Sequence, residues 1–212
     1  SSLIALLISV FGGLILSILS VFFVFKSIRG GMKSDRNLCF LSLLVSLLPL
    51  IIMAPQILAA VSVPPIHDIS TDTKNPPLFV EAKLFRTGTI NGAEYGDEAW
   101  PAERLAATTL AAYPELRPIN SSLKISEAVE KSREVLQSMD LEIINVDPEG
   151  GLLEAVDTSF WFGFKDDMVV RVQETSTGVR IDVRSKSRLG QSDLGINAKR
   201  VLAFIDRFTS GN

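Results

Sequence analysis

Cysteine and histidine are almost absent from the 212-residue sequence, which contains one of each, Cys39 and His67. A single cysteine forms no internal disulfide, so a disulfide-stabilised mini-protein is excluded. One histidine and one cysteine also fall short of the usual ligand set of a zinc site. The sequence shows no P-loop, no dinucleotide-binding glycine motif and no nucleophile elbow. We therefore expect no metal, no cofactor and no catalytic residues.

Charged side chains are missing from two long segments, residues 1–25 and 38–62. A helix over residues 3–25 rises roughly 34 Å, enough to cross a hydrocarbon core of about 30 Å. The segment 38–62 is equally long, and its Pro49 and Pro55 are tolerated in membrane helices. Residues 1–62 are thus predicted to form a transmembrane helical hairpin whose loop spans residues 26–37.

The predicted loop carries the cations Lys26, Arg29, Lys33 and Arg36 and one anion, Asp35. Short loops rich in lysine and arginine stay in the cytoplasm, so both termini are expected on the opposite side. In a bacterium this predicts an inner-membrane protein with periplasmic N- and C-termini. Cleavage of a signal peptide near Ala59 and Ala60 is the alternative, and the length of the apolar run argues against it.

Small residues recur every four positions in the first predicted span, at Ser9, Gly13 and Ser17. Such spacing lets two helix backbones approach closely. The stripe either seats the second helix of the same hairpin or contacts another membrane subunit.

The remaining residues, 63–212, are acidic, with 17 Lys and Arg against 23 Asp and Glu, a net charge of −6. This balance excludes a nucleic-acid partner, because binding to nucleic acid depends on neutralising phosphates. Two proline pairs, at 64–65 and 76–77, predict that residues 63–118 form an irregular connector with one short helix at 102–112. We expect this connector to wrap the domain surface or to meet a partner.

Residues 119–212 show the pattern of an α+β domain. A helix is predicted over residues 126–139, capped by Ser126, and a closing helix near Ser192 and Asp193. Between them lie four strand-like runs, at residues 141–146, 152–158, 168–172 and 179–185, and a further strand is indicated near 119–124. The last run alternates apolar and charged residues, which predicts one buried and one solvated face. The expected fold is a membrane-anchored two-layer α+β domain with a four- to five-stranded, mainly antiparallel sheet and two helices on one face.

The densest polar clustering lies around the predicted last strand and last helix. In one interpretation, Arg188 and Arg200 clamp an anion near the helix start, where backbone N–H groups are free. The competing interpretation is a buried salt-bridge and cap network. The candidate residues are Asp166, Asp167, Arg184, Arg188, Ser192, Asp193, Asn197 and Arg200.

Three aromatic residues, Trp161, Phe162 and Phe164, flank Gly163. They are interpreted as a lid on the core, as the lining of an apolar pocket, or as a group that dips into the membrane surface. His67 lacks partners for catalysis in the sequence and is expected at the surface or bonded to backbone.

Four motifs, at residues 64–72, 113–118, 161–167 and 182–198, together resemble the DUF1499 family, a domain of unknown function. The resemblance covers about residues 64–208. It implies an envelope or lumenal domain, often behind a membrane anchor, and implies no catalytic residue.

These observations favour a non-enzymatic accessory subunit of a larger membrane assembly, with other membrane proteins and the lipid bilayer as partners. A periplasmic binder of lipid or of a small apolar ligand is the second hypothesis, and an uncharacterised enzyme is the third.

Overall fold

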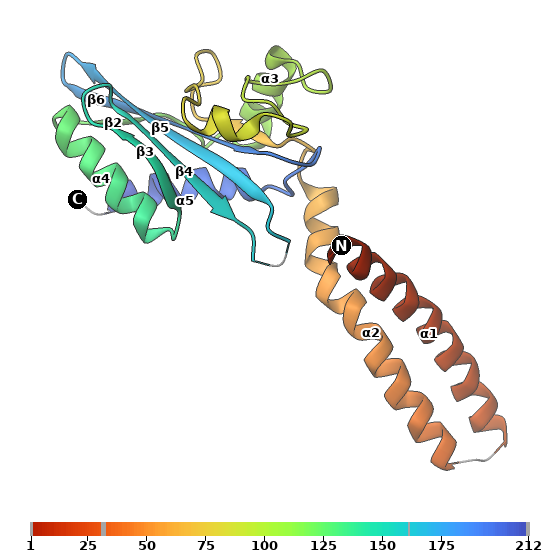
Figure 1. Ribbon diagram of the computed structural model, residues 1–212. Helices are drawn as coiled ribbons and strands as arrows, with labels where there is room; N and C mark the ends of the chain where they lie inside the picture. Colours follow the sequence, from red (N-terminus) through yellow and green to blue (C-terminus); the bar gives the residue numbers. More distant parts are fainter. Residues whose placement is uncertain (1, 31–32, 161, 211–212) are drawn as a thin grey trace. The chain divides into compact units, whose positions relative to one another are not determined.

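The computed structural model describes residues 2–30, 33–160 and 162–210, with some helix side chains left out. The chain forms two compact units, residues Ser1–Val61 and Ser62–Asn212. The first consists of helices α1 (Ser2–Gly30) and α2 (Lys33–Ser62), drawn in red and orange in Figure 1. Both continue into residues 26–37, so most of the predicted loop is helical. By length and composition, Val10–Gly30 and Asn37–Pro55 are apolar enough to cross a membrane.

Small polar residues lie between α1 and α2. Ser17 Oγ is 2.8 Å from Ser46 Oγ, and Ser20 Oγ is 2.8 Å from Ser42 Oγ. Large apolar side chains such as Phe11, Ile15 and Ile18 point outwards and are 59–63% exposed. This is the reverse of a water-soluble hairpin, in which the apolar side chains would face each other.

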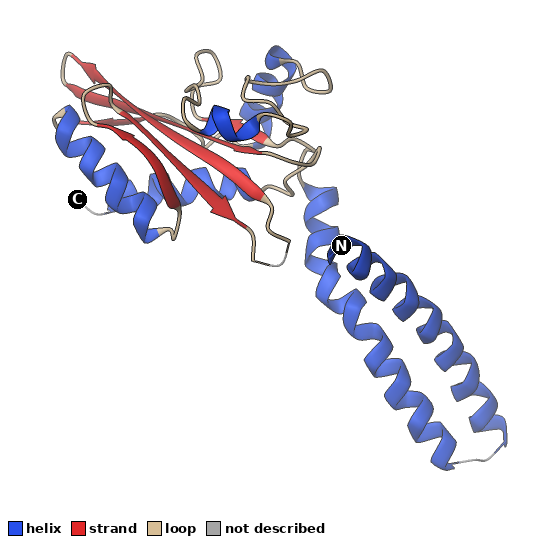
Figure 2. Ribbon diagram, in the orientation of Figure 1, coloured by secondary structure: helices blue, strands red, loops and turns tan. Residues whose placement is uncertain are grey.

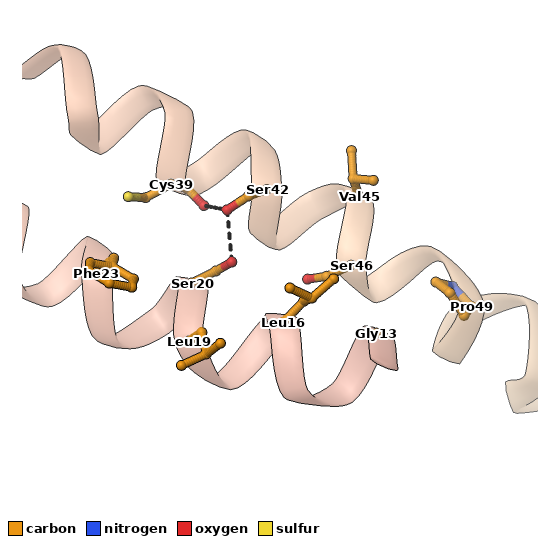
Figure 3. A pocket seen from close by; sticks show the side chains of 10 residues that line it. All are labelled: Gly13, Leu16, Leu19, Ser20, Phe23, Cys39, Ser42, Val45, Ser46 and Pro49. Atoms are coloured by element: carbon orange, nitrogen blue, oxygen red, sulfur yellow. Dashed lines mark hydrogen bonds between the residues drawn. The ribbon is translucent and has the colours of Figure 1, made fainter. Parts of the chain in front are cut away.

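Of the small-residue stripe, Gly13 and Ser17 face the second helix of the same hairpin. A Cβ atom on Gly13 would lie 2.8 Å from the Ser46 carbonyl oxygen, so the two backbones approach closely there. The side chain of Ser9 lies outside the part that the structure describes. A groove of about 490 Å³ follows the contact between the helices and includes Gly13, Ser20 and Pro49 (Figure 3).

Gly13→Ile is expected to separate the two helices, because its side chain would collide with the backbone of α2. The measurement is disulfide formation between Ser20→Cys and Ser42→Cys in the reconstituted full chain carrying Cys39→Ser. Gly13→Ile should lower the yield several-fold. Gly12→Ile is the control, since a Cβ there meets nothing within 4 Å, and equal yields from both variants would contradict this packing.

The second unit contains a six-stranded antiparallel sheet, shown in red in Figure 2. The strands, in the order of their pairing, are β1 (Asp68–Ser70), β6 (Gly178–Ser187), β5 (Lys165–Thr175), β4 (Leu152–Thr158) and β3 (Glu142–Asp147). The short β2 (Ile119–Ser121) pairs with the start of β6, and β1 pairs with the end of β6 along the same edge. The expected antiparallel α+β architecture is confirmed, and β1 is a strand that the sequence did not indicate.

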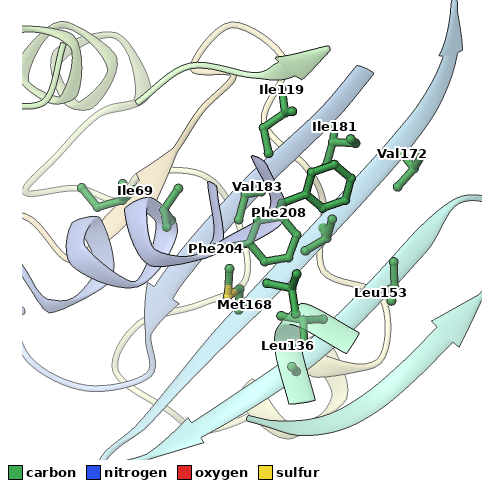
Figure 4. Close-up of a cluster of buried hydrophobic side chains, with 14 of the residues drawn as sticks. Ile69, Ile119, Leu136, Leu153, Met168, Val172, Ile181, Val183, Phe204 and Phe208 are labelled. Atoms are coloured by element: carbon green, nitrogen blue, oxygen red, sulfur yellow. The ribbon is translucent and has the colours of Figure 1, made fainter. Parts of the chain in front are cut away.

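Helices α4 (Ile125–Ser138) and α5 (Ile196–Ser210) cover one face of the sheet (Figure 2). The space between them and the sheet is filled by side chains that include Leu136, Met168, Phe204 and Phe208 (Figure 4). The rings of Phe204 and Phe208 stack with centroids 5.9 Å apart. Helix α4 begins one residue before the predicted cap, and the Lys124 N–H donates to Glu127.

The prediction of a solvated second face is wrong. Of the three charged residues that alternate along β6, Asp182 and Arg184 are fully buried, and only Arg180 is partly exposed, with 39% of its side chain accessible. The two buried residues are covered by residues 72–97, here called the covering segment, which includes the 3₁₀ helix η1 (Ala82–Arg86). The compact unit begins at Ser62, so residues 63–118, with helix α3 (Ala102–Ala112), fold together with the domain.

Candidate functional site

The polar cluster expected from the sequence is divided between the two faces of the sheet. Successive residues of a strand point to opposite faces. Asp166 and Asp167 are neighbours on β5, so Asp166 faces α5 while Asp167 faces the covering segment. The structure therefore does not bring Arg188 and Arg200 together, because they pair with different carboxylates on different faces.

On the helix side, Arg200 joins α5 to the sheet. Its guanidinium donates to Asp157 and, at 2.9 Å, to Asp166 Oδ2. The other end donates at 3.0 Å to Ser185 Oγ and also to Asn197 Oδ1. Asn197 in turn donates from Nδ2 to Ser187 Oγ and to the His67 carbonyl. These donors and acceptors satisfy one another, as buried polar networks require.

The start of α5 is occupied by its own carboxylate. Asp193 accepts hydrogen bonds from the N–H groups of Gly195 at 2.7 Å and Asn197 at 3.1 Å, and Ser192 Oγ accepts one from Leu194. Burial raises the pKa of Asp193, while these two N–H groups oppose that shift. The N–H groups proposed to bind an anion are thus already used to cap the helix.

On the opposite face, Asp68 and Arg184 form a bidentate ion pair. Arg184 Nε lies 2.8 Å from Asp68 Oδ1 and an Nη lies 2.9 Å from Oδ2, with both side chains at most 1% exposed. Lys186 Nζ approaches Asp68 Oδ2 to 3.3 Å. Burial favours the neutral acid, but the charges of Arg184 and Lys186 and the Gly96 N–H outweigh it and hold the pKa of Asp68 below its usual value.

The same cations hold the covering segment in place. Arg184 donates to the carbonyl oxygens of Pro77, Ala93 and Glu94, and Lys186 Nζ donates to that of Glu94. These bonds tie the covering segment to β6 at points 90 or more residues away along the chain. This network therefore holds the covering segment against the sheet.

A second ionic group includes Asp167, which is fully buried between two arginines. Arg86 Nε lies 2.7 Å from Asp167 Oδ2, and Arg188 donates to both carboxylate oxygens. Arg86 also donates to the carbonyl oxygens of Asn91 and Lys186. Burial lowers the pKa of Arg86, and the charge of Asp167 opposes that shift.

Glu154 on β4 holds the start of η1. Its fully buried carboxylate accepts hydrogen bonds from the N–H groups of Val80, Glu81 and Ala82 at 2.8–3.2 Å, and from Asn145 Nδ2 at 3.0 Å. Four of the buried charged residues on this face were not expected from the sequence: Asp68, Arg86, Glu154 and Lys186. Asp68 lies within the first motif and Lys186 within the fourth, and these motifs were the available signals.

Glu154→Ala is expected to release the covering segment, because three backbone N–H groups would lose their acceptor at about 1–3 kcal/mol for each buried donor left unpaired. Trypsin should then cut after Lys83 or Arg86 while the rest of the domain stays folded. Glu174→Ala, which changes an exposed glutamate on β5, is the matched control. Equal resistance of both variants would show that Glu154 does not hold this segment.

His67 is buried at the start of β1 and is 4% exposed. Its Nδ1 lies 3.4 Å from the Gln191 carbonyl oxygen. Asp97 Oδ2 is 3.2 Å from Nε2, yet the two are not aligned for a hydrogen bond. Among the described residues, no group of three His, Cys, Asp or Glu side chains is arranged to hold a metal ion.

The aromatic group lies at the surface, in the turn between β4 and β5. Phe164 is 43% exposed and stacks on Phe162 with centroids 5.4 Å apart, and Phe160 is 89% exposed. Trp161 lies outside the described residues. These rings are separate from the side chains that fill the core beneath α4 and α5.

Comparison with known proteins identifies the family of the second unit. No curated protein shows significant similarity to the chain. A family profile described as "Protein of unknown function (DUF1499)" matches residues 68–208, from the buried Asp68 to the core residue Phe208. This range includes both polar networks and the covering segment, and it confirms the resemblance drawn from the four motifs. The chain therefore belongs to the DUF1499 family, behind two helices that are apolar enough to anchor it in a membrane.

Proposed function

We propose that this protein is a non-catalytic accessory subunit of a larger membrane assembly, with its DUF1499 domain on the periplasmic side of a bacterial inner membrane. Support for the anchor comes from the apolar exterior of α1 and α2 and their hydrogen-bonded serines. Support for the orientation comes from the four cations in residues 26–36, which favour a cytoplasmic turn.

A non-catalytic role is supported by how the charged groups are used. Asp68, Asp167 and Arg184 are fully buried and paired, so they serve the fold and do not face a substrate. Catalytic groups need access to a reacting atom and a place where that atom can sit. The alternative of a ligand pocket beneath the helices gains no support, because bulky side chains fill that space (Figure 4).

The observation that carries the proposal is the apolar exterior of the covering segment. Its inner side is fastened to the sheet by ion pairs, while its outer side exposes large apolar side chains by 53–79%. Clusters of this kind on a folded domain mark contact sites for other proteins. The residues are Leu78, Val80, Leu84, Phe85 and Ile90.

Blue-native electrophoresis of mildly solubilised native membranes tests this proposal. The wild-type chain should migrate within a larger complex, and Leu84→Glu, which places a charge in the contact, should shift it to its free mass. Thr177→Glu, in an exposed turn, is the control and should leave the complex intact. Migration of the wild-type chain as a free small protein would refute the accessory role.

A reporter enzyme fused after Asn212 tests the compartment separately. A reporter active only in the periplasm is expected. Activity only in the cytosol would refute the proposed orientation without bearing on the complex.

A further inference from the structure

One end of the domain exposes apolar side chains on two adjoining turns. These are residues 159–164, between β4 and β5, and residues 188–190, after β6, here together called the tip. Arg188 N–H donates to the Lys165 carbonyl at 3.0 Å, which joins the two turns. Phe160, Phe164 and Leu189 are 89%, 43% and 45% exposed. Apolar side chains thus gather where the strands end.

Hydrogen bonds order the backbone of the tip. Ser159 N–H donates to the Phe164 carbonyl at 2.8 Å, and Ser159 Oγ accepts from the Phe164 N–H at 2.9 Å. Asn91 Nδ2 holds the second turn by donating to the Gly190 carbonyl at 2.8 Å. The turn that carries the aromatic rings is therefore already ordered. Burying these rings against another surface would cost little further backbone entropy.

The tip lies at the same end of the domain as the residues through which the chain enters it. Ser187 N–H donates to the His67 carbonyl, and Asp193 N–H donates to that of Ile66. Gly195 faces the Val63 side chain. Ser62 is the last residue of α2, and the four residues from there to Ile66 reach at most about 14 Å when extended. The loops after β6 are thus bonded to residues only a few positions from the apolar helix.

We propose that the tip enters the interfacial layer of the bilayer that holds the anchor. Exposed phenylalanine and leucine side chains next to a bilayer are buried at the boundary between headgroups and acyl chains, where they leave water while the backbone stays hydrated. Phenylalanine and leucine side chains on turns suit insertion among lipid headgroups. The tip is a different surface from the outer side of the covering segment, which is the proposed contact for another protein. This inference rests on the membrane anchoring in the proposed function, and not on the accessory role.

Site-specific fluorescence in nanodiscs tests the inference on the full chain. In a Cys39→Ser background, single cysteines replace Phe160, Leu189 or Thr177 and carry an environment-sensitive label. Thr177 lies in the turn between β5 and β6, at the far end of the 11-residue strand β5, roughly 30 Å from the tip. Lipids with a nitroxide high on the acyl chain should quench labels at 160 and 189 at least two-fold more than the label at 177.

Each other outcome overturns the inference. If the protein fails to insert into nanodiscs, the anchoring and the tip contact are refuted together. If it inserts and the lipid nitroxide quenches all three positions equally, the tip contact alone is refuted. If labels at 160 and 189 are shielded from aqueous iodide but not quenched by the lipid, a protein surface covers the tip, and the lipid assignment is wrong.

Discussion

Arg184→Met is expected to destabilise the domain by about 3–5 kcal/mol, the cost of leaving one member of a buried ion pair without its partner. The change removes the bidentate partner of Asp68, which keeps only the longer contact to Lys186 and the Gly96 N–H. It also removes the donor to the carbonyl oxygens of Pro77, Ala93 and Glu94. Urea unfolding of the full chain in micelles, followed by near-ultraviolet circular dichroism, measures the loss. A change below about 1 kcal/mol would mean that the pair contributes no more than an exposed one.

Lys186→Met is the matched comparison, because Lys186 is equally buried and contacts the same carboxylate. Burial lowers the pKa of Lys186, against the charge of Asp68, so burial of this ammonium group is itself costly. After Lys186→Met, Asp68 keeps both bonds to Arg184, and the Glu94 carbonyl keeps its bond from Arg184. We expect a much smaller loss than for Arg184→Met. Arg133→Ala, which breaks an exposed pair with Glu130, should change the free energy of unfolding much less than Arg184→Met does.

Acid is expected to weaken the domain through Asp68. Its pKa in the folded domain is held below the usual value, so the unfolded chain binds the proton more readily. The stabilisation from this group is fully present above the unfolded pKa of about 3.9 and is lost as the pH falls through the lower folded pKa. The free energy of unfolding should therefore fall as the medium is acidified below pH about 4.

The difference between wild type and Asp68→Asn isolates this contribution. Asp68→Asn should be less stable at pH 7, because Arg184 and Lys186 lose their counter-charge. The difference in unfolding free energy between wild type and Asp68→Asn should become smaller as the pH falls below about 4, because the wild-type carboxylate is then protonated and neutral as well. Asp206→Asn, which removes a carboxylate at an exposed position of α5, serves as the control. If the difference in unfolding free energy between wild type and Asp68→Asn does not change between pH 7 and 3, Asp68 is not the source of the acid sensitivity.

The regular elements of the domain were predictable because they depend on local patterns. Period-two alternation located β6, a strand-like run between turn residues located β4, and the apolar stripe that ends at Phe208 located α5. Strand β1 was missed because it has three residues and its burial comes from pairing with β6, more than 100 residues further along. The expected cap at Asp193 is present, although α5 itself starts at Ile196.

The charged face of the sheet was misjudged for a physical reason. Alternating charges on a strand normally indicate contact with water. Here Asp182 accepts from Arg171 and Arg180, and Arg184 is paired with Asp68, so the charges are compensated within the protein. That compensation depends on residues 68–97, whose proline pair at 76–77 and turn residues indicate loop. A single sequence does not show which carboxylate a distant arginine will meet.

The placement of β1 and the covering segment has a consequence for biosynthesis. Both emerge early from the ribosome, yet their hydrogen-bonding partners are on β6. Arg184, the partner of Asp68, follows it by 116 residues in the sequence. Contacts between such remote positions form slowly, because a long loop must close first. Until the last strand has been made, β1 has no strand to pair with and the Asp68 carboxylate lacks Arg184. Chaperone contact at this stage would therefore centre on residues 68–97.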